Sequence, residues 1–132
     1  MNLEQLFDLA PHGPDVFVGE GHEYPWGGLF GGHIVAQALR AAAFTVSDEL
    51  LPHSLRAYFI RRGDNTQPVR YEVDRIRDGK SFTTRRVVAR QQDGAILNLE
   101  ASFQVQEDSL NEQLVHPQPN LPLPDSIEES SW

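Results

Sequence analysis

Residues 21–46 read GHEYPWGGLFGGHIVAQALRAAAFTV, a glycine-rich loop that leads directly into an alanine-rich segment. The loop, residues 21–32, holds five glycines and a proline, which is typical of backbone that passes close to a neighbouring group. In residues 33–46, apolar side chains recur at helical spacing on one stripe: Ile34, Val35, Ala38, Leu39 and Ala42. We therefore predict a helix over 33–46 whose five alanines allow another surface to approach closely.

The sequence that follows this helix alternates between apolar and polar residues, the period of β-strands. Strands are predicted over residues 53–61, 68–76, 81–91 and 95–106. Asp-Gly pairs at 78–79 and 93–94 are the turns expected of hairpins, so the last three strands form an antiparallel meander. Upstream, residues 3–10 have helical spacing and residues 14–19 have the composition of a short strand. The fold class is α+β, with the helix covering the apolar face of the sheet.

Composition and charge divide the chain into two parts. The 132 residues include no cysteine, no run near the ~18 apolar residues of a membrane span and no signal peptide, which predicts a cytoplasmic protein without membrane insertion. Residues 1–90 hold 11 acidic and 11 basic side chains, whereas residues 91–132 hold eight acidic and no basic ones. We predict one domain over residues 1–108 and a proline-rich, acidic tail over 109–132.

Several stretches carry a resemblance to a known family. They are GLFGGHIVAQALRAA (28–42), PHSLRAYFIRRG (52–63), YEVDRIRDGKSFTTRRVV (71–88) and ASFQ (101–104). In this order and spacing they resemble the N-terminal half of type II acyl-CoA thioesterases, which carry two hotdog domains in one chain. The resemblance implies a single hotdog fold here, a central helix wrapped by a curved antiparallel sheet.

The sequence also departs from that family. The family usually has Gln where this chain has His33, and the stretch YPWGG (24–28) is not a recognised feature of it. The Asp, Thr and Gln catalytic set of the family lies in its second domain, so it cannot be carried over to this chain.

Thioester hydrolysis needs a donor that polarises the carbonyl, and the start of the central helix is one candidate. Gly31 and Gly32 present backbone N–H groups at the positive end of the helix dipole, although tight packing is an alternative reason for glycine there. No carboxylate lies between His33 and Val46, so His33 is the candidate base, with an unperturbed pKa of about 6.5. The alternative for His33 is a solvated residue of the first turn.

Two glutamines complete the predicted catalytic set by resemblance. When the two halves of the family are aligned, Gln37 falls where the catalytic half has its Asp, and Gln104 where it has its Gln. Gln37 shares an exposed stripe with His33, and Gln104 lies with Ile96 on the polar face of the last strand, where a plain surface role is the alternative. Glu20, His22 and Glu23 lie just before the glycines at 27–32, and this group could supply a carboxylate from a partner chain.

The substrate groups are assigned from residue type. Bases that could bind the CoA phosphates are Arg61, Arg62, Arg77, Lys80 and Arg85, with a solvated strand face as the alternative. Aromatic residues that could line an acyl pocket are Phe44, Phe59 and Phe82. No metal site is predicted because the histidines and carboxylates lack a metal-ligand spacing.

Two functions follow from the resemblance. The first is an acyl-CoA thioesterase that hydrolyses fatty acyl-CoA to free acid and CoA as a hotdog homodimer, since one domain alone leaves a sheet edge unpaired. The second is a non-catalytic acyl-CoA-binding module, or a subunit completed by a partner that carries the catalytic half. Both take acyl-CoA, with coenzyme A as part of the substrate and no separate cofactor, and neither binds nucleic acid. A hotdog hydratase would need an Asp and a His in a motif that the sequence lacks.

Overall fold

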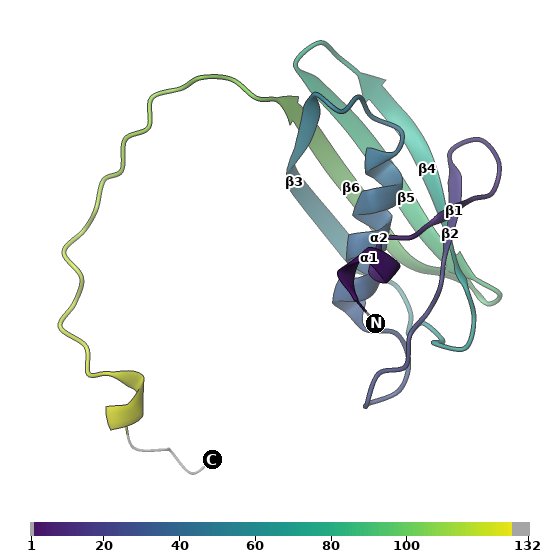
Figure 1. Ribbon diagram of the computed structural model, residues 1–132, viewed down its shortest axis with the longest axis horizontal. Helices are drawn as coiled ribbons and strands as arrows, with labels where there is room; N and C mark the ends of the chain where they lie inside the picture. The colour runs from purple at the N-terminus through teal and green to yellow at the C-terminus, as the bar shows by residue number, and fades with distance from the viewer. Residues whose placement is uncertain (1, 128–132) are drawn as a thin grey trace.

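The computed structural model describes residues 2–127, and one long helix lying across a six-stranded antiparallel sheet dominates it (Figure 1). The helices are α1 (Leu3–Leu6) and α2 (Gly31–Ala43), and a short 3-10 turn spans Pro124–Ser126. The strands are β1 (Ala10–Pro11), β2 (Val16–Gly19), β3 (Leu50–Phe59), β4 (Val69–Asp78), β5 (Phe82–Gln91) and β6 (Gly94–Val105). Their order in the sheet is β1-β2-β4-β5-β6-β3. This is the predicted α+β hotdog architecture, and the prediction is confirmed.

The strands follow the predicted meander, because β4 pairs with β5 and β5 with β6, all antiparallel. Strand β3 joins the free side of β6 and starts at Leu50, three residues before the predicted start. A register shift between Pro52 and Ser54 interrupts the ladder. The proline has no N–H to donate, which makes this a natural place for a bulge.

The helices are both shorter than predicted. Helix α2 includes the two glycines and ends at Ala43, three residues before the predicted end at Val46. Helix α1 stops at Leu6, and Ala10 is extended and pairs with Val18. Proline at position 11 explains the extended conformation of Ala10, since the residue before a proline is disfavoured in the helical region.

The core lies between α2 and the concave face of the sheet. The helix buries Ile34, Ala38, Ala41 and Ala42 against Tyr71, Val87, Ala89, Leu97, Leu99, Ala101 and Phe103. The three alanines are fully buried, so the small side chains bring the helix backbone close to the strands, as predicted. Ile96, expected on the polar face, is buried instead, because it is the extra residue in a register shift between β5 and β6.

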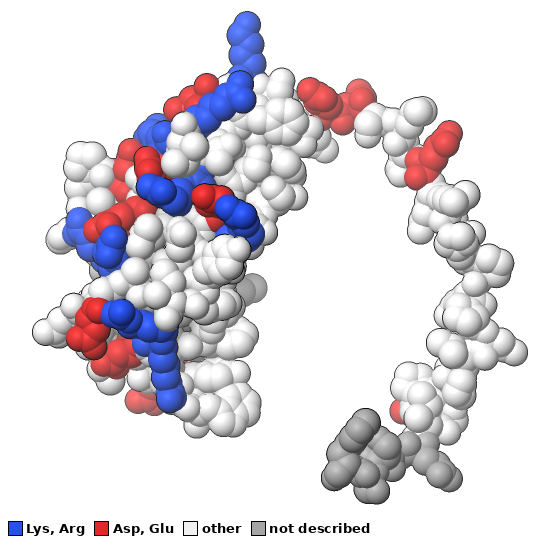
Figure 2. Space-filling view, turned by 180° about the vertical axis from the view of Figure 1, so that it is seen from behind, with Lys and Arg blue, Asp and Glu red and all other residues white. Residues whose placement is uncertain are grey.

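The opposite face of the sheet carries alternating charges (Figure 2). They form cross-strand ion pairs, among them Arg56–Glu100, Arg86–Asp74 and Arg90–Glu72. Beyond Val105, residues 106–123 have no helix or strand and extend away from the domain (Figures 1 and 2). This segment has acidic side chains but no Lys or Arg. In residues 2–127, no helix is long and apolar enough to span a membrane.

Candidate functional site

The N-terminus of α2 is open. Its N-cap residue, Phe30, is extended and no side chain caps the first amides, nor is there an acidic residue in the first turn. A Cβ added at Gly31 would lie 2.9 Å from the Phe59 ring, and one at Gly32 would lie 2.6 Å from the Phe30 ring. A side chain at either position would therefore have to displace an aromatic ring. The same packing leaves uncapped amides at the positive end of the helix dipole, a place where a developing oxyanion would be stabilised.

Two hollows flank this helix end. On the β3 side, a cleft of about 450 Å³ brings together four predicted site residues, Gly31, Phe59, Arg61 and Arg62. On the other side, a pocket of about 280 Å³ is lined by Leu6, His22, Glu23, Tyr24, Phe30, Gly32 and His33. The site built by the single chain is thus centred on the start of α2, with guanidinium groups on one flank and imidazoles on the other.

His33 lies in the wall of this pocket, but it is not the solvated residue of an exposed stripe that the sequence indicated. Its side chain is only 6% exposed, and its Nε2 is buried without a hydrogen-bond partner. Burial and the nearby His22 both lower the pKa of His33, which keeps the ring neutral. The two imidazole rings lie 5.3 Å apart between centroids. His22 is the more accessible of the pair, although the sequence pattern indicates only a minor role for it.

Gln37 is fully buried, so the expectation of an exposed Gln37 beside His33 is wrong. Its Oε1 accepts a hydrogen bond of 2.7 Å from the Tyr71 hydroxyl, and its Nε2 donates to the Leu6 carbonyl at 2.9 Å. Desolvation in the same place strongly raises the pKa of Tyr71. Gln37 therefore ties α1 and β4 to the central helix, which is a positioning role.

Gln104 does not join the site at the start of α2. Phe59, Leu97, Ala89 and Tyr71 form one row across the sheet, and α2 contacts that row at both Phe59 and Tyr71. Gln104 lies seven residues farther along β6 than Leu97, about 23 Å at the usual rise of a strand. It pairs with Leu51 and Phe82 instead.

The three phenylalanines expected to line an acyl pocket are not brought together in one chain. Phe59 packs on Gly31. Phe44 packs against Phe17, with 5.2 Å between the ring centroids, and lines a separate hollow of about 720 Å³ beside α1. Phe82 is half-exposed, with its ring edge-on to His53 at 5.7 Å.

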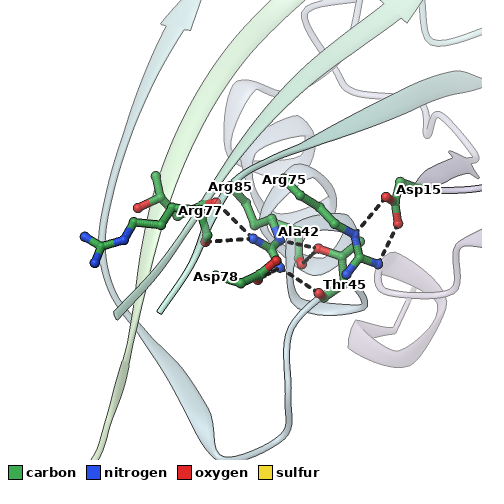
Figure 3. Close-up of polar contacts among 8 residues, drawn as sticks. Asp15, Ala42, Thr45, Arg75, Arg77, Asp78 and Arg85 are labelled. Atoms are coloured by element: carbon green, nitrogen blue, oxygen red, sulfur yellow. Dashed lines mark hydrogen bonds and ion pairs between the residues drawn. The ribbon is translucent and has the colours of Figure 1, made fainter. Parts of the chain in front are cut away.

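Arg85, expected to bind a CoA phosphate, is buried and engaged inside the domain (Figure 3). Its side chain is 1% exposed, and it donates to Thr45 Oγ1 at 2.7 Å, to the Thr45 carbonyl at 2.9 Å and to Asp78 at 2.5 Å. These bonds hold the end of α2 to the β4–β5 hairpin, so Arg85 is structural. Arg77 and Lys80 lie at the same hairpin, away from the start of α2.

Arg61 and Arg62 donate to backbone carbonyls, whereas most other arginines pair with carboxylates. Six arginines form ion pairs with carboxylates: Arg56, Arg70, Arg75, Arg85, Arg86 and Arg90. Arg61 donates to the Asp93 carbonyl and Arg62 to the Trp26 carbonyl, at 2.8 Å for the latter. Their charges are not neutralised by these bonds. No group of three metal-ligating side chains occurs among the residues that the structure describes.

Comparisons with known proteins agree on one family. Residues 22–104 match the family described as acyl-CoA thioesterase N-terminal domain. The chain is 42% identical over 122 residues to acyl-coenzyme A thioesterase 8 from Homo sapiens, covering 92% of this chain and 38% of that protein. It is 34% identical over 131 residues to acyl-CoA thioesterase 2 from Haemophilus influenzae, covering 99% and 43%.

The solved structures give the same result. The crystal structure of an acyl-CoA thioesterase II, TesB2, from Mycobacterium marinum superposes with a TM-score of 0.77 at 37% identity. The match covers 92% of this chain and 46% of that one. This chain therefore spans less than half the length of the relatives that it resembles.

Proposed function

Because this chain belongs to the acyl-CoA thioesterase N-terminal domain family, we propose that it hydrolyses acyl-CoA thioesters to a free acid and CoA. The observation that carries the proposal is the convergence of Gly31, Phe59, Arg61 and Arg62 on one cleft beside the open start of α2. Hydrolysis needs a polarised carbonyl and a water made nucleophilic, and a cation favours binding of the CoA phosphates. Each has a candidate within this region.

The carbonyl of the thioester is proposed to lie at the N-terminus of α2. The extended backbone of Phe30 and the lack of a side-chain cap support this role for the amides of the first turn. Backbone N–H groups fixed by a helix are already oriented before the substrate arrives. They stabilise the oxyanion of the tetrahedral intermediate without reorganisation.

His22 is proposed to activate the attacking water. His22 lines the same pocket as Gly32, and the distance between the ring centroids of His22 and the neutral His33 is 5.3 Å. An imidazole is the usual general base in proteins. In this reading His33 is a buried neighbour that positions His22, and the glutamines Gln37 and Gln104 take no part in the chemistry.

A second copy of the chain is proposed to complete the site. Within residues 2–127, the edge strand β3 has no partner on its outer side, and four of its apolar side chains are substantially exposed: Leu51, Leu55, Tyr58 and Phe59. An exposed, apolar edge strand readily pairs with another strand. Antiparallel pairing of two β3 strands would set the cleft of one copy beside the start of β3 in the other.

A non-catalytic acyl-CoA-binding module, or a subunit of a larger enzyme, is the second candidate. One observation favours it: helix α2 contains no carboxylate. In that case the same cleft would bind CoA and the reacting groups would come from a different protein.

Release of free CoA separates these functions. Purified protein is incubated with acyl-CoAs of increasing chain length, and the thiol is followed with a chromogenic reagent for wild type, His22→Ala and the matched surface variant His12→Ala. We expect turnover that falls at least tenfold in His22→Ala and is unchanged in His12→Ala. Binding of acyl-CoA without turnover at any chain length would exclude the enzyme and leave the binding module. Equal turnover in all three proteins would exclude His22 as the base.

A further inference from the structure

The loop that leads into α2 carries a short stack of aromatic rings, with a third ring tilted against it, that the proposed chemistry leaves unused. Tyr24 stacks on Phe30, with 5.2 Å between ring centroids and 24° between ring planes. On its other side the Trp26 ring lies 4.9 Å away between centroids and is tilted by 56°. Phe30 is half-exposed, and Trp26 at the end of the stack is 75% exposed. A large ring supported from below and open above is suited to stacking with a planar ligand.

Arg62 is fixed directly to this stack. Its Nη2 donates a hydrogen bond of 2.8 Å to the carbonyl of Trp26 itself. The turn that follows has Gly27 and Gly28 at φ +68° and +70°, and a Cβ on Gly28 would lie 2.6 Å from Arg62 Nε. Glycine is thus needed both for the backbone conformation and for the arginine to lie against the loop.

The charge beside the stack is positive and available. Arg62 and the adjacent Arg61 bond to backbone carbonyls, and no carboxylate within residues 2–127 forms an ion pair with either guanidinium. A planar group next to a phosphate would satisfy the open ring and the free charges together. That combination is the chemistry of a phosphorylated adenosine, since purines stack on aromatic side chains and guanidinium groups bind phosphate.

We propose that Trp26 and Arg62 bind the nucleotide end of coenzyme A, with adenine stacked on the indole and a phosphate on the guanidinium. This rests on the proposed function only for the choice of CoA among adenine nucleotides. Trp26 is five residues from Gly31, so at most about 18 Å of backbone separates the stack from the start of α2. The flexible pantetheine arm joins the two places, and the acyl thioester then reaches the helix N-terminus.

Tryptophan fluorescence tests this binding site directly. The sequence has two tryptophans, Trp26 and Trp132, so Trp132→Phe leaves Trp26 as the single reporter. Adenosine 3′,5′-bisphosphate, CoA and pantetheine are titrated separately. We expect the two nucleotides to quench the emission with saturation, and pantetheine, which lacks the adenine, to leave it unchanged.

Affinity in variants supplies the second readout, measured by calorimetry so that it does not depend on the indole. Base–aromatic stacking contributes about 1–3 kcal/mol, so Trp26→Ala should weaken adenosine bisphosphate binding roughly 5- to 150-fold, and Trp26→Phe much less. Arg62→Met should weaken binding and reduce its salt dependence. The matched control is Arg56→Met, which removes an exposed arginine already paired with Glu100.

The outcomes separate this inference from the proposed function. If Trp26→Ala binds adenosine bisphosphate as tightly as wild type, or pantetheine quenches as strongly as the nucleotide, the nucleotide site is wrong even when thioesters are hydrolysed. If the nucleotides bind at Trp26 but no acyl-CoA is hydrolysed, the nucleotide site stands and the thioesterase proposal falls. ATP binding as tight as that of CoA would overturn the choice of CoA as the ligand.

Discussion

Replacing Gln37 by leucine tests whether this residue holds the fold together or takes part in catalysis. Leucine has a similar volume, but it has no amide for the Tyr71 hydroxyl or the Leu6 carbonyl. Tyr71 is fully buried, so its hydroxyl would lose its acceptor where water cannot replace it. A buried polar group left unpaired costs about 1–3 kcal/mol, and each lost hydrogen bond about 0.5–1.5 kcal/mol. We expect Gln37→Leu to lower the free energy of unfolding by about 2–4 kcal/mol.

The assay is urea unfolding followed by circular dichroism, for wild type, Gln37→Leu, Tyr71→Phe and the double variant. With a slope of about 1–3 kcal/mol per molar urea, the midpoint of Gln37→Leu should fall by roughly 1–3 M. The double variant removes the donor together with its acceptor. It should be less destabilised than the sum of the two single variants, because no hydroxyl is left unpaired.

Two results would refute this reasoning. An unchanged midpoint in Gln37→Leu would show that the buried hydrogen bonds are not formed in solution. Additive effects in the double variant would show that Gln37 and Tyr71 do not interact. A fully stable Gln37→Leu protein that has lost thioester hydrolysis would return Gln37 to the catalytic set.

Three further predictions concern other parts of the molecule. Because the pKa of His33 is lowered in the folded state, the unfolded chain binds the proton more tightly than the folded chain. The free energy of unfolding of wild type should therefore fall as the pH falls below about 6.5, by up to about 1.4 kcal/mol per pH unit. The urea midpoint of His33→Gln should depend less on pH in the same range. Arg85→Met should lower the free energy of unfolding by about 1–3 kcal/mol and leave the Kd for CoA unchanged. Arg62→Met should weaken CoA binding and leave the free energy of unfolding unchanged. Tenfold weaker CoA binding by Arg85→Met would contradict its structural role. Leu55→Lys puts a charge on the exposed edge of β3, where the proposed dimer would pair. At one protein concentration, wild type should sediment as a dimer and Leu55→Lys as a monomer with an unchanged circular dichroism spectrum. A dimeric Leu55→Lys would place the interface elsewhere.

Periodicity was sufficient for the elements of this fold, because each signal lies within the element itself. The alanine stripe of α2 and the alternation from Leu97 to Phe103 in β6 report directly on the face that is buried. The helix ends were harder to predict from the sequence. Helix α1 ends at Leu6, and Ala10 and Pro11 then pair with β2. This pairing depends on a strand that lies several residues downstream, which the helical spacing of residues 3–10 does not show.

The site residues were harder to predict because their surroundings come from distant parts of the chain. Gln37 and His33 formed a polar stripe on the helix, and nothing in that stripe shows that α1 and the segment at Glu20 cover it. Arg85 could have been recognised, since it shares a strand face with the buried Val87 and Ala89. The distance of Gln104 from the start of α2 follows from strand register, which a sequence pattern does not give.

The proposal that two copies joined through β3 form a thioesterase is tested most directly by the dependence of activity on assembly. The release of CoA thiol per chain is measured over a range of protein concentrations, alongside the dimer fraction from sedimentation, for wild type and Leu55→Lys. We predict that the activity per chain rises with the dimer fraction of wild type and stays near background in Leu55→Lys. Full activity in the monomer, or no CoA release from any acyl-CoA by the dimer, would contradict the account.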